Sequence, residues 1–240
     1  MTVKAVVERL VKSTREQPAD FSGRDLSFLD LSDLDFKGAR MAGADLYGSD
    51  LSHANLAGAD LAGARLDRTV IIGTDFSGAN LSGASLLRPA AFSSLETRRD
   101  EAPRFAGANL SGARLFGRFA KGDWRGANLA AAQFDAGRGA QMTLPMLPRT
   151  DLAGCDLTGA NLAGADLAGA SLTFADLTGA NLSDANLAGA DLSRANMTGA
   201  DVTGANLATA DLDGTVLKAV RGLTQTRGID AARNRAAAVE

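Results

Sequence analysis

Histidine and cysteine, two side chains that often carry out catalysis or bind metals, are nearly absent from this sequence. His53 is the only histidine and Cys155 the only cysteine. Catalytic triads need a base beside the nucleophile, and zinc sites need several His or Cys ligands, so neither residue has the partners for such chemistry. The sequence also contains no Walker-type glycine loop and no nucleophile elbow. It therefore predicts no catalytic residue, no metal site and no cofactor.

Carboxylates are the most regularly spaced polar groups in the chain. Four of them form two pairs that are each twenty residues apart, namely Asp156 with Asp176 and Asp191 with Asp211. If twenty residues make one structural repeat, each pair stacks about 5 Å apart, where like charges repel by about 1 kcal/mol even in water. One interpretation is that the side chains turn outward or cap nearby backbone N–H groups. The other is an acidic face that attracts a basic partner.

A period of five residues indicates the elements that position these side chains. A large apolar residue, mostly Leu or Phe, occupies every fifth position from Phe21 to Leu86 and again from Leu152 to Leu217. A helix or a flat strand would leave about half of these residues in water. All of them face inward only if the backbone bends by about a right angle every five residues. Four bends then close a coil of about twenty residues, and coils stack at the strand spacing of about 4.8 Å.

Small residues and glycines agree with this geometry. Ala usually stands two residues before the apolar centre, with Asp or Asn between them, and Gly often follows two residues after it, as at Gly43 and Gly58. Gly in this place predicts type II turns, which require φ > 0. By the same register, His53 falls on an outward turn position and Cys155 on an inward one. We therefore expect a solvated histidine and a buried, inert thiol.

The consensus Ala-(Asp/Asn)-Leu-X-X, seen here in ANLAG, ADLAG and ANLSG, resembles the pentapeptide-repeat family. The resemblance covers about residues 19–219 and implies an all-β fold, a right-handed quadrilateral β-helix. Residues 1–18 are expected to form an N-terminal capping helix, since the apolar residues of 3–16 follow one helical face and Pro18 ends it. Residues 220–240 are expected to form a C-terminal cap or tail, with an irregular turn and then a helix near 228–238.

The repeat is interrupted near its middle. A loop at about 93–104 carries charged residues, and a smaller bulge falls at about 135–141. The loop is either an interaction site, as long loops on rigid scaffolds often are, or a tolerated insertion, because lengthening a loop costs little entropy. The waist of the rod next to it is predicted to expose an apolar docking patch. The candidate loop residues are Arg98, Arg99, Asp100, Glu101 and Arg104, and the candidate waist residues are Phe116, Phe119, Lys121 and Trp124.

Charge and composition limit the remaining function classes. The formal net charge is −3, but residues 87–149 hold ten bases and five acids, whereas 150–217 hold nine acids and a single base, Arg194. Acidic faces argue against specific nucleic acid binding. The N-terminal apolar stretch is broken by Glu8 and Arg9, so it lacks the core of a signal peptide, and no apolar run reaches the ~20 residues of a membrane span. Together with one cysteine, this predicts a soluble, cytoplasmic protein.

Two functions remain open. The first is a non-enzymatic protein-interaction or scaffold module, which presents rigid β-helix faces and the projecting loop to an unidentified protein partner. The second comes from the resemblance: the fluoroquinolone-resistance pentapeptide proteins are acidic rods, which implies a DNA-mimicking binder of type II topoisomerase (gyrase). The basic waist counts against the second. A homodimer formed through one end of the solenoid is a further alternative.

Overall fold

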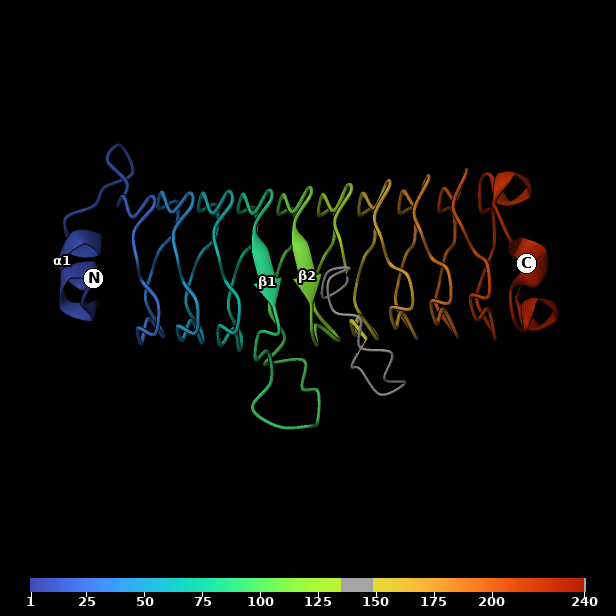
Figure 1. Cartoon of the computed structure of the whole chain (residues 1–240), viewed down its shortest axis with the longest axis horizontal. Helices are drawn as coiled ribbons and strands as arrows, with labels where there is room; N and C mark the ends of the chain where they lie inside the picture. Colours follow the sequence, from blue (N-terminus) through green and yellow to red (C-terminus); the bar gives the residue numbers. More distant parts are fainter. Residues whose placement is uncertain (135–148, 240) are drawn as a thin grey trace, which may run out of the picture.

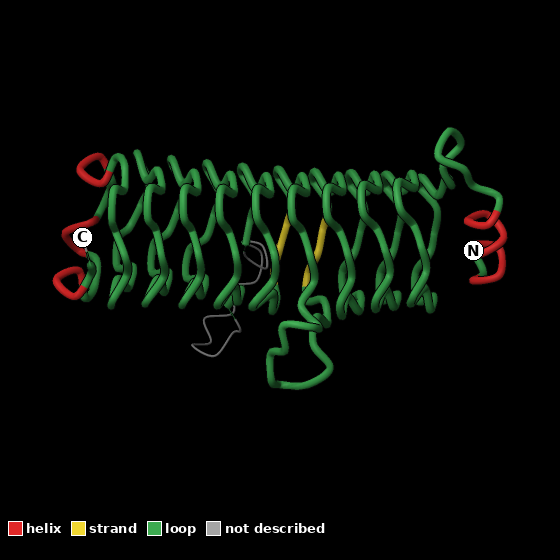
Figure 2. The backbone as a smooth tube through the Cα atoms, turned by 180° about the vertical axis from the view of Figure 1, so that it is seen from behind, coloured by secondary structure: helices red, strands yellow, loops and turns green. Residues whose placement is uncertain are grey.

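The computed structural model of the protein describes residues 1–134 and 149–239. The chain winds into a stack of coils that forms a straight rod, with the N-terminus at one end and the C-terminus at the other (Figure 1). Seen from behind, the same rod shows one loop standing clear of the coils near its middle (Figure 2). Most of the backbone is turn and single bridges, because a bend every five residues leaves no room for longer strands.

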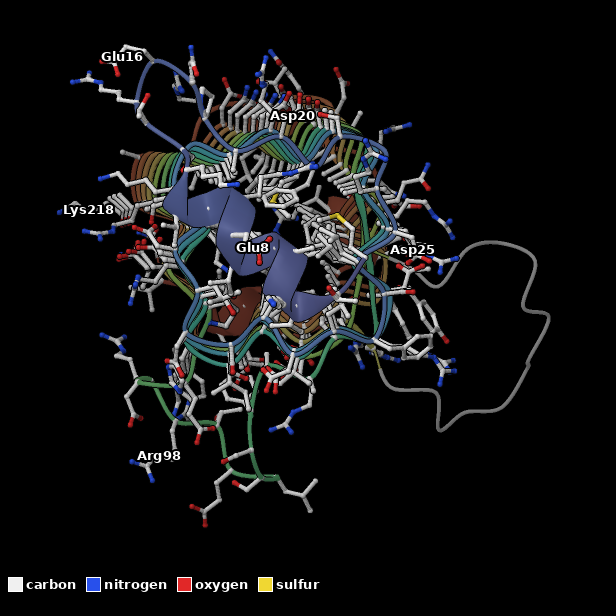
Figure 3. All side chains as sticks on the ribbon, turned by 90° about the vertical axis from the view of Figure 1, so that its left-hand side faces the viewer. Glu8, Glu16, Asp20, Asp25, Arg98 and Lys218 are labelled. Atoms are coloured by element: carbon white, nitrogen blue, oxygen red, sulfur yellow. The ribbon has the colours of Figure 1, made fainter. Side chains whose placement is uncertain are left out.

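Backbone pairing sets the length of one coil at twenty residues, as the period predicts. Asp20 pairs in parallel with Arg40, and Asp25 with Asp45, and so on along the chain. The pairing residues therefore form four columns, which we number first to fourth from their initial residues Asp20, Asp25, Asp30 and Asp35. In a view along the axis, Asp20 and Asp25 lie on neighbouring sides of the rod (Figure 3). Two short strands in the second column, β1 (Ser85–Leu87) and β2 (Arg114–Phe116), pair in parallel with Leu86 opposite Leu115.

The interior is filled by the periodic apolar residues and by the small residues two positions before them. Leu26, Leu31 and Phe36 are fully buried, and so are nearly all of their counterparts along the rod. Most bends are closed by a hydrogen bond, such as the one from Ala44 N to Met41 O at 3.0 Å, around a residue with positive φ, here Gly43 at 64°. This bond and this φ are the two features that the type II prediction requires.

A ladder of amide side chains runs along the first column. Its members are Asp60, Asn80, Asn109, Asn128, Asn161 and Asn181, and each amide Nδ2 donates to Oδ1 of the preceding member at 2.9–3.2 Å. The ladder continues from Asn80 to Asn109 and from Asn128 to Asn161, across both irregular parts of the sequence. The first column therefore links neighbouring coils by side-chain hydrogen bonds past both irregular parts, in addition to the backbone pairing that the second and fourth columns also keep there.

A helix covers the N-terminal end of the rod. Helix α1 (Val3–Val11) begins after Thr2, whose hydroxyl accepts a hydrogen bond from Ala5 N. Val6 is fully buried in the core, whereas Val11 is 79% exposed, so only part of the predicted apolar face is covered. The side chain of Arg9 donates to the carbonyl of Asp20, an acceptor at the open edge of the first coil.

The expected helix near 228–238 is wrong. The chain instead makes one more coil, with steps of six residues in place of five: Arg221, Arg227, Arg233 and Val239 pair with Asp201, Asn206, Asp211 and Val216. Three 3-10 turns lie on this coil, η1 (Leu223–Gln225), η2 (Ile229–Ala231) and η3 (Arg235–Ala237). Left-handed residues precede them, Gly222 at φ 75° and Gly228 at φ 72°, and they bend the chain before a helix can grow.

The sequence predicts two interruptions of the repeat. The bulge at 135–141 lies outside the described residues. The loop lies within them: the step from Ala90 of the third column to Arg104 of the fourth is fourteen residues, where the regular step is five. Ala91 still occupies an inward position, at 2% exposure, so the departure begins after it.

Candidate functional site

The loop projects from the edge of the rod between the third and fourth columns (Figure 1), and Arg98 lies well outside the outline of the coils (Figure 3). Four of the five predicted loop residues belong to it. Arg104 does not, because it has already rejoined the fourth column, where its Nη2 lies 3.0 Å from Asp75 Oδ2. The edge that carries the loop also carries His53, which is exposed as expected.

The base of the loop is closed by side chains of its own residues. Glu101 accepts hydrogen bonds from the backbone N–H and the hydroxyl of Ser93, at 3.0 and 2.7 Å. Its carbonyl accepts from Gly73 N of the coil before. Arg98 forms an ion pair with Asp100 at 3.0 Å, although both side chains are largely exposed. These charged residues of the loop therefore stabilise the conformation of the loop itself.

Two cations from the next coil hold the rest of the loop. Arg118 donates from Nη1 to Ser94 O at 3.1 Å and from Nη2 to Leu95 O at 2.7 Å. Lys121 donates from Nζ to Thr97 O at 2.7 Å. The guanidinium of Arg118 also lies 5.2 Å from the ring centroid of Phe92, within the range of a cation–π contact. Within residues 94–97 of the loop, three of the four backbone carbonyls are thus bound by side chains of the rod.

The predicted apolar patch at the waist is wrong. Phe119 and Trp124 are fully buried and Phe116 is 7% exposed, so only Lys121 of the four residues reaches solvent. Trp124 stacks on Phe105 with ring centroids 4.1 Å apart and meets Phe119 edge-on at 5.7 Å. The short step from Leu115 to Phe119 keeps these aromatic residues on inward positions, since Asp123 still pairs with Arg104.

The exposed apolar residue of this region lies on the loop itself. Leu95 is 93% exposed, while its carbonyl is bound by Arg118. Further along the same edge, Phe174 is 61% exposed at a positive φ of 58°, with Arg194 5.5 Å from its ring centroid. An aromatic residue in the left-handed region is strained and gains little here from burial. Leu95 and Phe174 are thus two exposed apolar side chains on one edge of the rod.

A hollow of about 330 Å³ lies at the base of the loop. It is lined by Arg99, Ala102, Arg104, Lys121, Gly122, Asp123, Arg125 and Asp156. Arg125 binds both oxygens of Asp123, at 2.9 and 2.6 Å, and its Nε lies 3.6 Å from Asp156. These hydrogen bonds lower the pKa of Asp123 and raise the pKa of Arg125. The two carboxylates of the hollow are therefore already engaged with one of its four cations.

The stacked aspartates are paired as predicted but do not make one acidic face. Asp156 pairs with Asp176 in the fourth column and Asp191 with Asp211 in the third, so the two pairs lie on neighbouring sides. Each carboxylate accepts a hydrogen bond from the backbone N–H two residues later, at 3.0–3.2 Å. The amide of Asn234 and the nearby Arg233 lower the pKa of Asp211. Capping of the turns, the first of the two interpretations, therefore accounts for these side chains.

Cys155 lies where the register places it. It is 1% exposed, and its thiol donates to Phe119 O at 3.1 Å. Burial raises the pKa of Cys155 to about 12, so the thiol stays protonated and unreactive at neutral pH. Among the residues that the structure describes, no cluster of His, Cys, Asp and Glu has the makeup of a metal site. Nor is any helix in this part of the chain long and apolar enough to cross a membrane.

Comparison with known proteins agrees with this architecture. The family model of pentapeptide repeats matches in eight copies, over residues 19–52, 49–86, 147–184 and 180–218. No significant match was found among curated proteins. One similar solved structure is HetL, a pentapeptide repeat protein involved in heterocyst differentiation regulation in the cyanobacterium Nostoc sp. strain PCC 7120. It is 28% identical over 100% of this chain and 94% of its own, with a TM-score of 0.45.

Two further structures are similar to parts of the rod. A pentapeptide repeat protein of the Arabidopsis thaliana thylakoid lumen is 28% identical over 49% of this chain and 66% of its own, with a TM-score of 0.28. QnrB1, a plasmid-mediated fluoroquinolone resistance protein, is 19% identical over 84% of this chain and 85% of its own, with a TM-score of 0.32. The assignment rests on the repeat model, which matches more than half of the sequence. This chain belongs to the pentapeptide repeat family.

Proposed function

We propose that this protein is a non-enzymatic interaction module that docks a protein partner on the edge carrying the loop at 93–104. One observation carries the proposal: Leu95 is 93% exposed on a backbone whose carbonyls at 94, 95 and 97 are bound by Arg118 and Lys121. A large apolar side chain is presented to solvent on a segment that is already ordered.

Ordering before binding favours association. A free loop loses conformational entropy when a partner fixes it, whereas a tethered one has lost most of that entropy on folding. A tolerated insertion needs no such tethers, because a loose loop of this length adds little to the free energy of folding. The tethers at Arg118 and Lys121 therefore favour an interaction site over a neutral insertion.

The edge beyond the loop extends the proposed surface. Lys121, Gly154, Phe174 and Arg194 occupy equivalent turn positions in successive coils, joined by hydrogen bonds such as Gly154 N to Thr173 O at 2.8 Å. A partner that covers Leu95 and continues along this edge reaches Phe174 and Arg194. Aromatic and arginine side chains are enriched among the residues that dominate binding energies. We therefore place the second contact of the partner at this pair.

The test is site-specific crosslinking in the host cell. A photoreactive benzoyl-phenylalanine replaces Leu95 in one variant and the half-exposed Ala62, on the opposite side of the rod, in a matched control. We expect one crosslinked partner from position 95, none from position 62, and loss of the product when Arg118→Gln releases the loop. Equal products from both positions, or none from position 95, would contradict the proposal.

Mimicry of DNA toward a type II topoisomerase is the second candidate. It is favoured by the excess of acids over residues 150–217, nine against one base, and by the stacked carboxylates of Asp156 and Asp176. The purified protein should then inhibit or protect DNA gyrase in a supercoiling assay. Asp176→Asn with Asp191→Asn should weaken that effect, whereas Leu95→Ser should not. If Leu95→Ser abolishes the effect on gyrase instead, the loop and not the acidic side chains is responsible for that effect.

Three finer features of the molecule are also proposals. We place the protein in the cytosol and take the coil as right-handed and quadrilateral, as the family resemblance implies. A homodimer through one end of the rod is the alternative to a monomer, and sedimentation equilibrium distinguishes the two. Fractionation of the host cell tests the location, and a crystal structure tests the hand.

A further inference from the structure

We infer that the hollow at the base of the loop binds a carboxylate group of the docked partner, so that the partner segment is both acidic and apolar. The inference rests on the proposed docking function and adds the chemistry of the partner. Its starting point is the cation content of the hollow, which is lined by four cations and two carboxylates within about 330 Å³.

The two carboxylates leave the lining with more cations than acids, and Arg125 engages both of them. It binds Asp123 through Nε and Nη2 and lies within 3.6 Å of Asp156. The other oxygen of Asp156, Oδ1, accepts a hydrogen bond from the backbone N–H of Thr158, at 3.1 Å. Of the other three cations of the lining, Arg104 is paired with Asp75 at 3.0 Å, whereas Arg99 and Lys121 form no ion pair within 4.0 Å with the residues that the structure describes.

These three cations keep many donors for a ligand. Arg104 uses Nη2 on Asp75, and Lys121 uses one of its three protons on Thr97 O. Arg99 forms no ion pair within 4.0 Å with any residue of the described ranges 1–134 and 149–239. A guanidinium offers five N–H groups in a planar fork that matches a carboxylate. Arg99 and Arg104 are thus the groups that would hold an anion in the hollow.

A carboxylate fits this site better than a phosphate. The surroundings include further negative charges, Asp100 and Glu101 on the loop and Asp123 and Asp156 in the lining. A dianionic phosphate is repelled by these groups about twice as strongly as a singly charged carboxylate, but it is also attracted about twice as strongly by the cations, so charge alone does not distinguish the two ligands. Leu95 on the same loop adds an apolar contact that a free phosphate cannot use. The shared chemistry is an oxyanion, and the source we commit to is an acidic side chain of the partner protein.

The site can be tested without the partner by NMR of the arginine Nε–H groups in the full chain. Sodium acetate is the probe for a carboxylate, inorganic phosphate the probe for the other source, and sodium chloride at equal ionic strength the blank. We expect a saturable shift at Arg99 and Arg104 with acetate, and none at the exposed Arg68. Arg99→Gln should weaken acetate binding, followed at Arg104, by about tenfold, as loss of a charged hydrogen-bonding group does. Arg68→Gln is the matched control and should leave it unchanged.

Each outcome bears on a different statement. Shifts at Arg99 that match those of Arg68, or a linear response in all three salts, would overturn the anion site. Saturation by phosphate at a lower concentration than acetate would overturn the choice of a carboxylate. If position 95 crosslinks a partner through a segment free of Asp and Glu, docking stands and the acidic segment is wrong. If acetate binds at Arg99 but nothing crosslinks at position 95, the docking function fails and the anion site stands.

Discussion

Arg118 donates from Nη2 to the carbonyl of Leu95 at 2.7 Å across 23 residues of sequence. The bond joins a coil in the middle of the rod to a segment that projects from the coil before it. It also fixes the backbone of a leucine whose side chain is almost entirely in water. This pairing of an ordered backbone with an exposed apolar side chain distinguishes the loop from the turns around it.

Removal of the Arg118 tether should loosen the loop and leave the rod intact. In Arg118→Gln we expect trypsin to cleave at Arg98 or Arg99 about tenfold faster, because hydrogen bonds from a charged donor contribute about 1.5–3 kcal/mol. The melting temperature should change little. Arg88→Gln is the control, since Arg88 also lies over a phenylalanine, Phe116 at 5.9 Å, but does not hold the loop. Equal cleavage rates in the two variants would show that the loop does not depend on Arg118.

Inward and outward positions should differ sharply in their tolerance of charge. Leu172 is fully buried and Thr173, the next residue, is half-exposed. Leu172→Asp leaves a carboxylate without a partner inside the stack and should destabilise the rod by at least ~3 kcal/mol, whereas Thr173→Asp should cost less than ~0.5 kcal/mol. Thermal unfolding followed by circular dichroism measures both. Similar melting temperatures for the two variants would refute the inward assignment.

The amide ladder should contribute more than an isolated turn cap. Asn128 donates to Asn109 and accepts from Asn161, both at 3.0 Å, and also caps Ala130 N. Asn128→Ala should therefore cost ~1–3 kcal/mol, because it leaves neighbouring amides unsatisfied. Asn55→Ala should cost less, since the side-chain oxygen of Asn55 caps only Ala57 N. Urea unfolding of the two variants measures the difference, and a greater loss in Asn55→Ala would contradict the role of the ladder.

The single thiol should be inert in the folded protein. Burial raises the pKa of Cys155 to about 12, and only the thiolate reacts. We expect no reaction with Ellman's reagent at pH 8 over an hour and complete reaction after denaturation. A repeat at pH 9 should remain slow, because the pH is still well below that pKa. Rapid labelling of the native protein at pH 8 would mean that Cys155 is accessible.

Acid should destabilise the rod through its turn-capping aspartates. Hydrogen bonds from Ser32 lower the pKa of Asp30, those from Arg125 lower that of Asp123, and those from Thr203 lower that of Asp201, all from 3.8. The stabilisation is therefore fully present above pH 3.8 and is lost as the pH falls through the lower folded-state values. Melting temperatures at pH 7 and pH 3 should show a decrease at pH 3. A higher melting temperature at pH 3 would contradict this sign.

Local regularity made most of the rod predictable. The period of five places Leu172, Cys155 and His53 correctly, because one residue of displacement turns a side chain from the core to the surface. The same rule should have placed Phe119 and Trp124 in the core. The four-residue step before Phe119 does not move these side chains outward, because Asp123 keeps its pairing with Arg104.

Other features depend on contacts that no local pattern records. Neither Leu95 nor Arg118 has a signal in the sequence, since one lies outside the repeat and the other looks like any outward arginine. Their contact follows from the stacking of two coils. The final coil did have a signal, a six-residue recurrence in RGLTQT, RGIDAA and RNRAAA that begins at Arg221, Arg227 and Arg233. A search for the period of five alone does not detect this recurrence.

The most direct test of the docking account uses the partner that crosslinks at position 95. Titration calorimetry measures the affinity of this partner for the Leu95→Ser variant and for the unmodified protein. Leu95 is 93% exposed, so the substitution should leave the melting temperature unchanged. The account predicts at least a tenfold weaker Kd, because burial of a leucine side chain against the partner contributes about 1.5–3 kcal/mol. An unchanged Kd in a normally folded Leu95→Ser variant would show that the loop does not dock the partner.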